Sequence, residues 1–136
     1  MIPDFDDTGN LPEGIHFATI EELIERFGDH PKRSWLIDGL KLLITALEKA
    51  NCPLIYIDGS FVTSKEIPGD YDLCWSMIGV VETKLDPVLL DFSPLGRERM
   101  EQKYRGDIFP AELPEGGSGK LFVDFFQTDK KKVLSR

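Results

Sequence analysis

One stretch of the chain, residues 54–78, constrains the fold more than any other. It begins with an apolar run, Leu54 to Ile57, which is typical of a buried strand. Gly59 and Ser60 break this run sharply, and after a spacer a second apolar run extends from Leu73 to Ile78. The stretch therefore predicts two buried strands joined by a loop.

An Asp-Tyr-Asp sequence stands at the head of the second predicted strand. Because successive strand side chains point to opposite faces, Asp70 and Asp72 share a face and Tyr71 points away. At about 3.3 Å per residue, the Cα atoms of the two aspartates lie roughly 6.5–7 Å apart. Carboxylates held that close repel each other, and a hard divalent cation removes the repulsion. The pair is therefore a candidate metal site.

Each half of this pattern has a simpler interpretation when taken alone. A Gly-Ser pair is most often a plain turn, and Asp-x-Asp is common in loops and at strand ends. The two together, each on a predicted strand and correctly spaced, favour a functional site. The pattern resembles the signature of the nucleotidyltransferase superfamily, which has the polymerase-β-like fold. That signature is an apolar residue, Gly, Gly or Ser, a spacer, then Asp-apolar-Asp or Asp-apolar-Glu. Here it is matched by Ile57, Gly59, Ser60, Asp70 and Asp72, with Asp58 inserted before the glycine.

The resemblance covers residues 54–78 and, less closely, residues 120–127. In the family a third carboxylate stands on a later strand, and residues 120–127 are predicted to form that strand, with Asp124 alone in an apolar run. The resemblance implies that Asp70, Asp72 and Asp124 bind Mg²⁺ or Mn²⁺ and are the catalytic carboxylates. Asp124 is expected to complete the second metal site and to help deprotonate an acceptor hydroxyl.

A phosphate cradle is predicted beside these acids. Glycine allows a close backbone approach at Gly59, and the hydroxyl of Ser60 can donate to a phosphate oxygen. The segment from Phe61 to Lys65 is predicted to begin a helix with free N–H groups, and Lys65 adds a positive charge. A later helix, predicted from Ser93 to Gly106, offers further charges that either meet phosphates or form a solvated face. Its basic residues are Arg97, Arg99, Lys103 and Arg105.

Two amphipathic helices are predicted before the first strand. Thr19 and Glu22 form a capping box at the start of the first, which ends at Gly28. The second runs from about Pro31 to Ala50, and Arg33 on it is interpreted either as a solvated side chain or as a phosphate contact. The predicted fold is therefore α/β (α+β), a small mixed sheet with helices packed on it and two helices before the first strand.

The 136 residues are predicted to form a single nucleotidyltransferase-like domain. Residues 1–18 are interpreted as an extended acidic arm, residues 108–114 as a short edge segment or loop, and residues 128–136 as a loose basic tail. No apolar run approaches the length of a membrane helix, and the acidic N-terminus does not resemble a signal peptide. A cytoplasmic protein without membrane contacts is therefore expected.

The distribution of charge limits the partners. Residues 1–72 hold 14 acidic and 6 basic side chains, whereas residues 73–136 hold 10 of each, and the net charge is −8. Such a chain is not expected to bind duplex DNA broadly, because that requires many phosphate contacts. A nucleotide or an RNA end needs only a local basic lining and remains compatible with the charge.

Two functions follow as hypotheses. The first is a metal-dependent nucleotidyltransferase that moves a nucleoside monophosphate from a nucleoside triphosphate to a hydroxyl of an RNA end, a protein or a small molecule. A narrower similarity, to transferase-like components of bacterial toxin–antitoxin systems, places this activity in such a system. The alternative is an inactive module that acts on a cognate partner protein as an antitoxin or regulatory subunit. Convergence of Asp124 with Asp70 and Asp72 is the predicted mark of the enzyme.

Overall fold

The computed structural model describes residues 2–12, 14–128 and 132–135 of the chain. It is a mixed α/β protein, as the sequence predicted. Its helices and strands follow the chain in the order β1 (Ile15–Ala18), α1 (Ile20–Phe27), α2 (Pro31–Lys49), β2 (Ile55–Asp58), the 3-10 helix η1 (Ser60–Val62), β3 (Tyr71–Trp75), the 3-10 helices η2 (Glu82–Lys84) and η3 (Pro87–Leu90), α3 (Pro94–Tyr104), β4 (Gly106–Pro110), α4 (Phe122–Thr128) and β5 (Lys132–Ser135).

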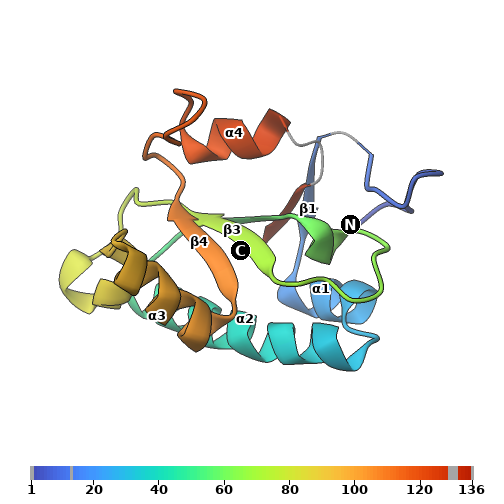
Figure 1. Cartoon of the computed structure of the whole chain (residues 1–136), viewed down its shortest axis with the longest axis horizontal. Coiled ribbons are helices and arrows are strands. Elements are labelled where there is room, and N and C mark those ends of the chain that lie inside the picture. Colours follow the sequence, from blue (N-terminus) through green and yellow to red (C-terminus); the bar gives the residue numbers. More distant parts are fainter. Residues whose placement is uncertain (1, 13, 129–131, 136) are drawn as a thin grey trace.

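The strands form one five-stranded sheet in the order β1-β5-β2-β3-β4. β2 pairs with β3 and with β5 in antiparallel fashion, whereas the pairs β3–β4 and β1–β5 are parallel. Figure 1 shows α1, α2 and α3 on one side of the sheet and α4 on the other. The sheet is therefore the middle layer, and its two faces have different covers.

Buried apolar side chains hold α2 against one face of the sheet. Leu36, Leu40 and Leu43 of α2 are fully buried in one core with Ile57 and Leu73 of the sheet. These strand residues alternate with residues that point to the α4 side, as the period of two requires. A smaller core, which includes the buried Cys74, lies on that other side. The side chains of β2 and β3 therefore point alternately to the large core under α2 and to the α4 side.

The predicted starts of the two leading helices are confirmed. Thr19 accepts from the backbone N–H of Glu22, and the Glu22 side chain reaches back to the N–H of Thr19, which completes the capping box. Gly28 caps the end of α1, and α2 begins with Pro31 in its first turn. Local capping chemistry therefore sets these boundaries, because free N–H groups at a helix start need acceptors.

The prediction that two helices precede the first strand is wrong, because β1 comes before α1. β1 forms the last part of the arm predicted over residues 1–18. Residues 132–135, predicted to lie in a loose tail, form β5, which lies between β1 and β2 and hydrogen-bonds to both. Each segment is four residues long and finds its partner far away in sequence, so periodicity could not reveal it.

The strand predicted over residues 120–127 is also wrong, because Phe122–Thr128 is the helix α4. Phe122 and Val123 pack against the small core of Cys74 and Ala111, so the apolar run buries one side of a helix. A short apolar run fits either structure until its packing partners are known. Within the described part of the chain, no helix has the length and apolar character needed to cross a bilayer.

Candidate metal site

Three aspartates form a row across neighbouring strands at one end of the sheet. Asp58 of β2 is in register with Asp72 of β3, and Asp72 is in register with Asp107 of β4. Paired residues in register point to the same face, here the face on the α4 side. Asp58 is buried, with 3% of its surface exposed, whereas Asp72 and Asp107 are half-buried. The sheet itself therefore concentrates negative charge at this position.

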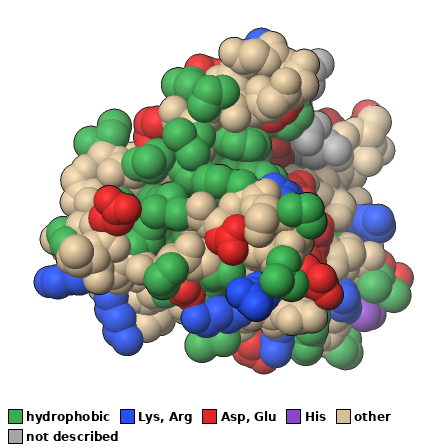
Figure 2. Space-filling model, turned by 60° about the vertical axis from the view of Figure 1, so that its left-hand side comes forward, with side chains coloured by type: hydrophobic (Ala, Val, Ile, Leu, Met, Phe, Trp, Pro, Cys, Tyr) green, Lys and Arg blue, Asp and Glu red, His purple; other side chains and the backbone are tan. Residues whose placement is uncertain are grey.

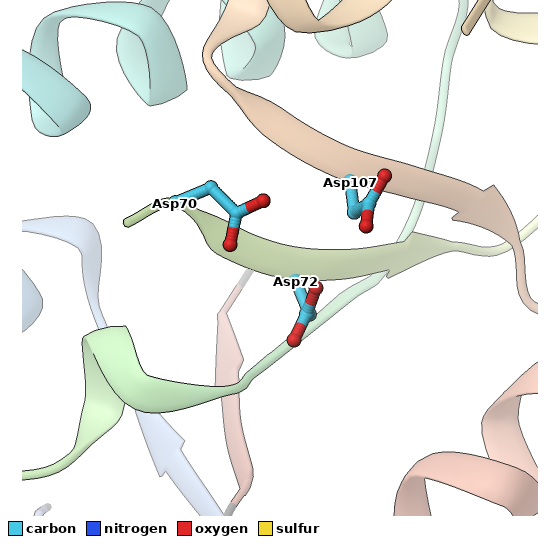
Figure 3. A group of neighbouring side chains, drawn as sticks. All are labelled: Asp70, Asp72 and Asp107. Atoms are coloured by element: carbon cyan, nitrogen blue, oxygen red, sulfur yellow. The ribbon is translucent and has the colours of Figure 1, made fainter. Parts of the chain in front are cut away.

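Asp70 joins this row from the residue before β3. Carboxylate oxygens of Asp70, Asp72 and Asp107 all lie within 4.8 Å of one another. In Figure 3 the three side chains lie close together over β3 and β4. The predicted pair Asp70 and Asp72 is therefore brought together as expected, with a third acid from the neighbouring strand.

Burial and repulsion act on the acids of this cluster. Burial raises the pKa of Asp70 above its ordinary value, the Asp107 carboxylate raises it further, and Lys32 opposes both effects. Burial also raises the pKa of Glu101 on α3, with further contributions from Asp70 and Asp107. Desolvation and like charges both disfavour the ionised carboxylate. The cluster thus carries a local excess of negative charge.

Helix α3 supplies the cation nearest to this charge. Arg97 donates from Nη2 to Oδ1 of Asp107 at 2.8 Å, and its guanidinium lies 4.6 Å from the ring centre of Phe109. Two other basic residues of the predicted helix have separate contacts, since Lys103 pairs with Asp86 and Arg105 stacks on Trp35. Arg97 is thus the residue of that basic set which contacts the acidic cluster.

Gly59 shapes the floor beside Asp72. Its backbone has φ +86° and ψ −171°, a region that is essentially restricted to glycine. A Cβ added at Gly59 would lie 2.4 Å from Oδ2 of Asp72, closer than two non-bonded atoms can approach. Ser60 follows as the first residue of η1, so the predicted helix start is a 3-10 helix of three residues. Gly59 therefore lies against Asp72, and Ser60 follows it in the chain.

Lys65 belongs to a different surface. It lines a pocket of about 510 Å³ together with Arg26 and His30, and it is not among the residues that line the pocket next to Asp72 and Asp107. Its carbonyl, with those of Phe27, Phe61 and Thr63, accepts hydrogen bonds from the buried guanidinium of Arg33. Lys65 thus lines a different pocket from Asp72 and Asp107. Arg33 is buried and holds the loop, so both interpretations of it, a solvated side chain and a phosphate contact, are wrong.

The structure also corrects the third carboxylate. Asp124 is an exposed residue of α4 and is not part of the cluster, whose third member is Asp107. Residues 106–110 contain a signal that the sequence interpretation missed, because Asp107 and Phe109 flank the buried Ile108 in strand-like alternation. The edge segment predicted from residue 108 begins two residues too late and so leaves Asp107 out.

The donors in this cluster fit a hard divalent cation. They are carboxylate oxygens from β3, β4 and the residue before β3, and burial together with the neighbouring Asp107 carboxylate raises the pKa of Asp70. Mg²⁺ and Mn²⁺ prefer such oxygen ligands, and Mg²⁺ keeps coordination positions for water and phosphate oxygens. Asp70, Asp72 and Asp107 are therefore the residues that would hold a metal.

Fold and site together define a mixed α/β protein with a carboxylate cluster at the ends of paired strands. The model of the DUF6932 family, described as a family of unknown function, matches residues 3–136, so the chain belongs to that family. Neither the curated proteins nor the solved structures contain a significant match to the chain.

Proposed function

We propose that the protein is a metal-dependent nucleotidyltransferase, which moves a nucleoside monophosphate from a nucleoside triphosphate to a hydroxyl acceptor. The observation that carries this proposal is the convergence of Asp70, Asp72 and Asp107 beside Gly59, which Ser60 follows in the chain. The Gly-Ser half and the Asp-x-Asp half of the sequence signature thus meet at one place. Asp107 adds the third carboxylate that the resemblance requires. The acceptor class, whether an RNA end, a protein or a small molecule, stays open in this proposal.

The residues have distinct roles in this reaction. The acceptor oxygen attacks the α-phosphorus, the bond from that phosphorus to the bridging oxygen breaks, and pyrophosphate leaves. Asp107 takes the part expected of Asp124 and accepts the proton of the acceptor hydroxyl, while Asp70 and Asp72 complete the cation site. Mg²⁺ bound there would neutralise phosphate charge and hold the attacking and leaving oxygens in line. The backbone at Gly59 and the Ser60 hydroxyl support the phosphates.

Arg97 provides the positive charge for the same phosphates. Its guanidinium already lies at the cluster, 2.8 Å from Asp107, and an arginine can bind a phosphate through two parallel hydrogen bonds. The pair with Asp107 is partly exposed, so exchanging one anionic partner for another costs little. Arg97 thus replaces Lys65 in the proposed set of nucleotide contacts.

A second candidate is an inactive module that acts through a cognate partner protein, for example in a toxin–antitoxin pair. The observation in its favour is the position of Asp124, which lies outside the cluster. The position of Asp124 does not argue against the enzyme, because Asp107 supplies a third carboxylate from β4. The enzyme is therefore the better supported function.

Transfer of label distinguishes the two candidates. Purified protein is incubated with cell extract, Mg²⁺ and each nucleoside triphosphate labelled at the α-phosphate. The enzyme transfers label to an acceptor and releases pyrophosphate, and Asp72→Asn abolishes transfer, whereas Asp38→Asn on the exposed side of α2 leaves it intact. A wild-type protein that transfers no label and binds no triphosphate would support the interaction module instead.

A further inference from the structure

A pocket opens directly from the acidic cluster. Its volume is about 460 Å³, within the range of small-molecule sites. Asp58, Asp72 and Asp107 line one part of it, and the other part is lined by three phenylalanines, Phe109, Phe122 and Phe125. We call this cavity the phenylalanine pocket. On the side turned forward in Figure 2, hydrophobic side chains gather between the region of α4 and that of α3, with acidic side chains beside them.

Two of the phenylalanines are fixed in place. The rings of Phe109 and Phe122 are stacked, with centroids 4.2 Å apart and an interplanar angle of 12°. Since Phe122 covers one face of the Phe109 ring, the guanidinium of Arg97, 4.6 Å from the ring centre, occupies the other face. Both rings also belong to the small core under α4. They form a rigid wall of the pocket.

Phe125 is the most exposed of the three phenylalanines. It is 39% exposed, lines the same pocket, and lies one helical turn after Phe122 on α4. A large aromatic side chain that faces a cavity beside fixed rings offers a flat surface to a planar ligand. Glu115 also lines this pocket, and its carboxylate accepts from the N–H groups of Gly117 and Ser118.

We infer that the phenylalanine pocket binds the base of the nucleoside triphosphate, with the base stacked against Phe125. This inference rests on the proposed function, because it places the triphosphate at the adjoining aspartates. A nucleotide joins a polyanion to a planar ring, and the pocket joins a cation-binding floor to an aromatic wall. Stacking accepts every base, since each has a π face, and purines offer the larger area.

Calorimetric titration with a base-free probe tests the inference. The four common ribonucleoside triphosphates and inorganic tripolyphosphate are each titrated into the full chain with Mg²⁺. We expect at least one nucleotide to bind more tightly than tripolyphosphate. Phe125→Ala should lower the affinity for that nucleotide by about 5- to 150-fold, which is the range of base–aromatic stacking. The affinity for tripolyphosphate should stay unchanged.

Two variants control for indirect effects. Phe125→Trp keeps a stacking surface and should retain the nucleotide affinity of the wild type. Phe92→Ala removes a phenylalanine of similar exposure, 41%, that does not line the pocket, and should change neither ligand's binding.

The outcomes separate this inference from the function on which it rests. Tripolyphosphate that binds as tightly as every nucleotide, or Phe125→Ala with wild-type nucleotide affinity, overturns the base site and leaves the metal–triphosphate site standing. A wild-type protein that binds neither probe overturns both.

Discussion

At Gly59 both the backbone conformation and the nearby Asp72 carboxylate require a glycine. Its φ of +86° with an extended ψ suits only glycine, and the space that a Cβ would need is filled by the Asp72 carboxylate. The close approach lets the strand end lie against the acid without a side chain between them. The backbone conformation and the contact with Asp72 thus explain why a glycine stands at the first position of the Gly-Ser pair.

Gly59→Ala should therefore damage both stability and the site. We expect the free energy of unfolding to fall by about 1–3 kcal/mol from backbone strain, and Mg²⁺-dependent triphosphate binding to be lost as Asp72 is displaced. Urea denaturation and calorimetry measure the two effects. Gly69→Ala is the control, because a Cβ there meets nothing within 4 Å. Equal behaviour of the two variants would contradict the role given to Gly59.

Asp70 makes the stability of the metal-free protein depend on pH. Its folded-state pKa is raised, so ionised Asp70 costs folding free energy at neutral pH, and the cost disappears as the pH falls below the unfolded value of about 3.9. Asp70→Asn should leave stability unchanged at pH 7 or raise it by up to about 1 kcal/mol, since solvent screens a half-buried group. The difference from wild type should shrink toward pH 4.

Thermal melts without metal over this pH range measure the effect. Addition of Mg²⁺ should raise the melting temperature of the wild type more than that of Asp70→Asn, because a cation that binds only the folded state stabilises it. A variant that is much less stable at pH 7 would show that Asp70 supports the fold.

At the scale of elements, Arg33 connects α2 to the loop that follows η1. It is 3% exposed and donates to four carbonyls, three of them in residues 61–65. A planar guanidinium with five donors can serve acceptors in several directions, which an ammonium on a flexible stem cannot match. This hydrogen-bond set fixes the loop between β2 and β3, which begins at Gly59 and ends at Asp70.

Arg33→Lys should lower the free energy of unfolding by about 2–4 kcal/mol, because buried carbonyls lose their donors. Arg99→Lys, on the exposed side of α3, is the matched control and should stay within about 0.5 kcal/mol of wild type. Chemical denaturation of both variants decides the matter, and equal stabilities would mean that Arg33 does not hold the loop.

Elements with local signals could be predicted from the sequence, and those without could not. The capping box at Thr19 and the proline-led starts of α2 and α3 depend on neighbouring residues, so their boundaries were readable. β2 and β3 were readable as apolar runs bounded by turn residues. The structural role of Arg33 could not be predicted, because its acceptor carbonyls lie up to 32 residues away in the sequence.

The third carboxylate shows the same limit within the site. Asp124 stands within a short apolar run and Asp107 at the start of another, and the local pattern does not show which of them lies beside Asp72. The parallel register between β3 and β4 makes the choice, because it places Asp107 directly beside Asp72. Such pairing depends on contacts distant in sequence, which a local pattern does not contain.

At the scale of the whole molecule, the aspartates of β2, β3 and β4 gather at one end of the sheet, where we propose the functional site. α1, α2 and α3 lie on one face, and α4 lies on the other (Figure 1). The phenylalanine pocket, which α4 helps to line, lies beside the acids. β1 and β5 complete the far side of the sheet from opposite ends of the chain. We propose above all that the acidic cluster binds a divalent cation.

Mn²⁺ binding, followed by electron paramagnetic resonance, tests that claim most directly. The wild type should bind Mn²⁺, and Asp107→Asn should weaken binding by more than about 10-fold, as loss of a metal ligand does. Asp124→Asn, an exposed residue of α4 outside the cluster, should bind like the wild type. No Mn²⁺ binding by the wild type at millimolar concentration, or equal affinity for Asp107→Asn and the wild type, would contradict the account.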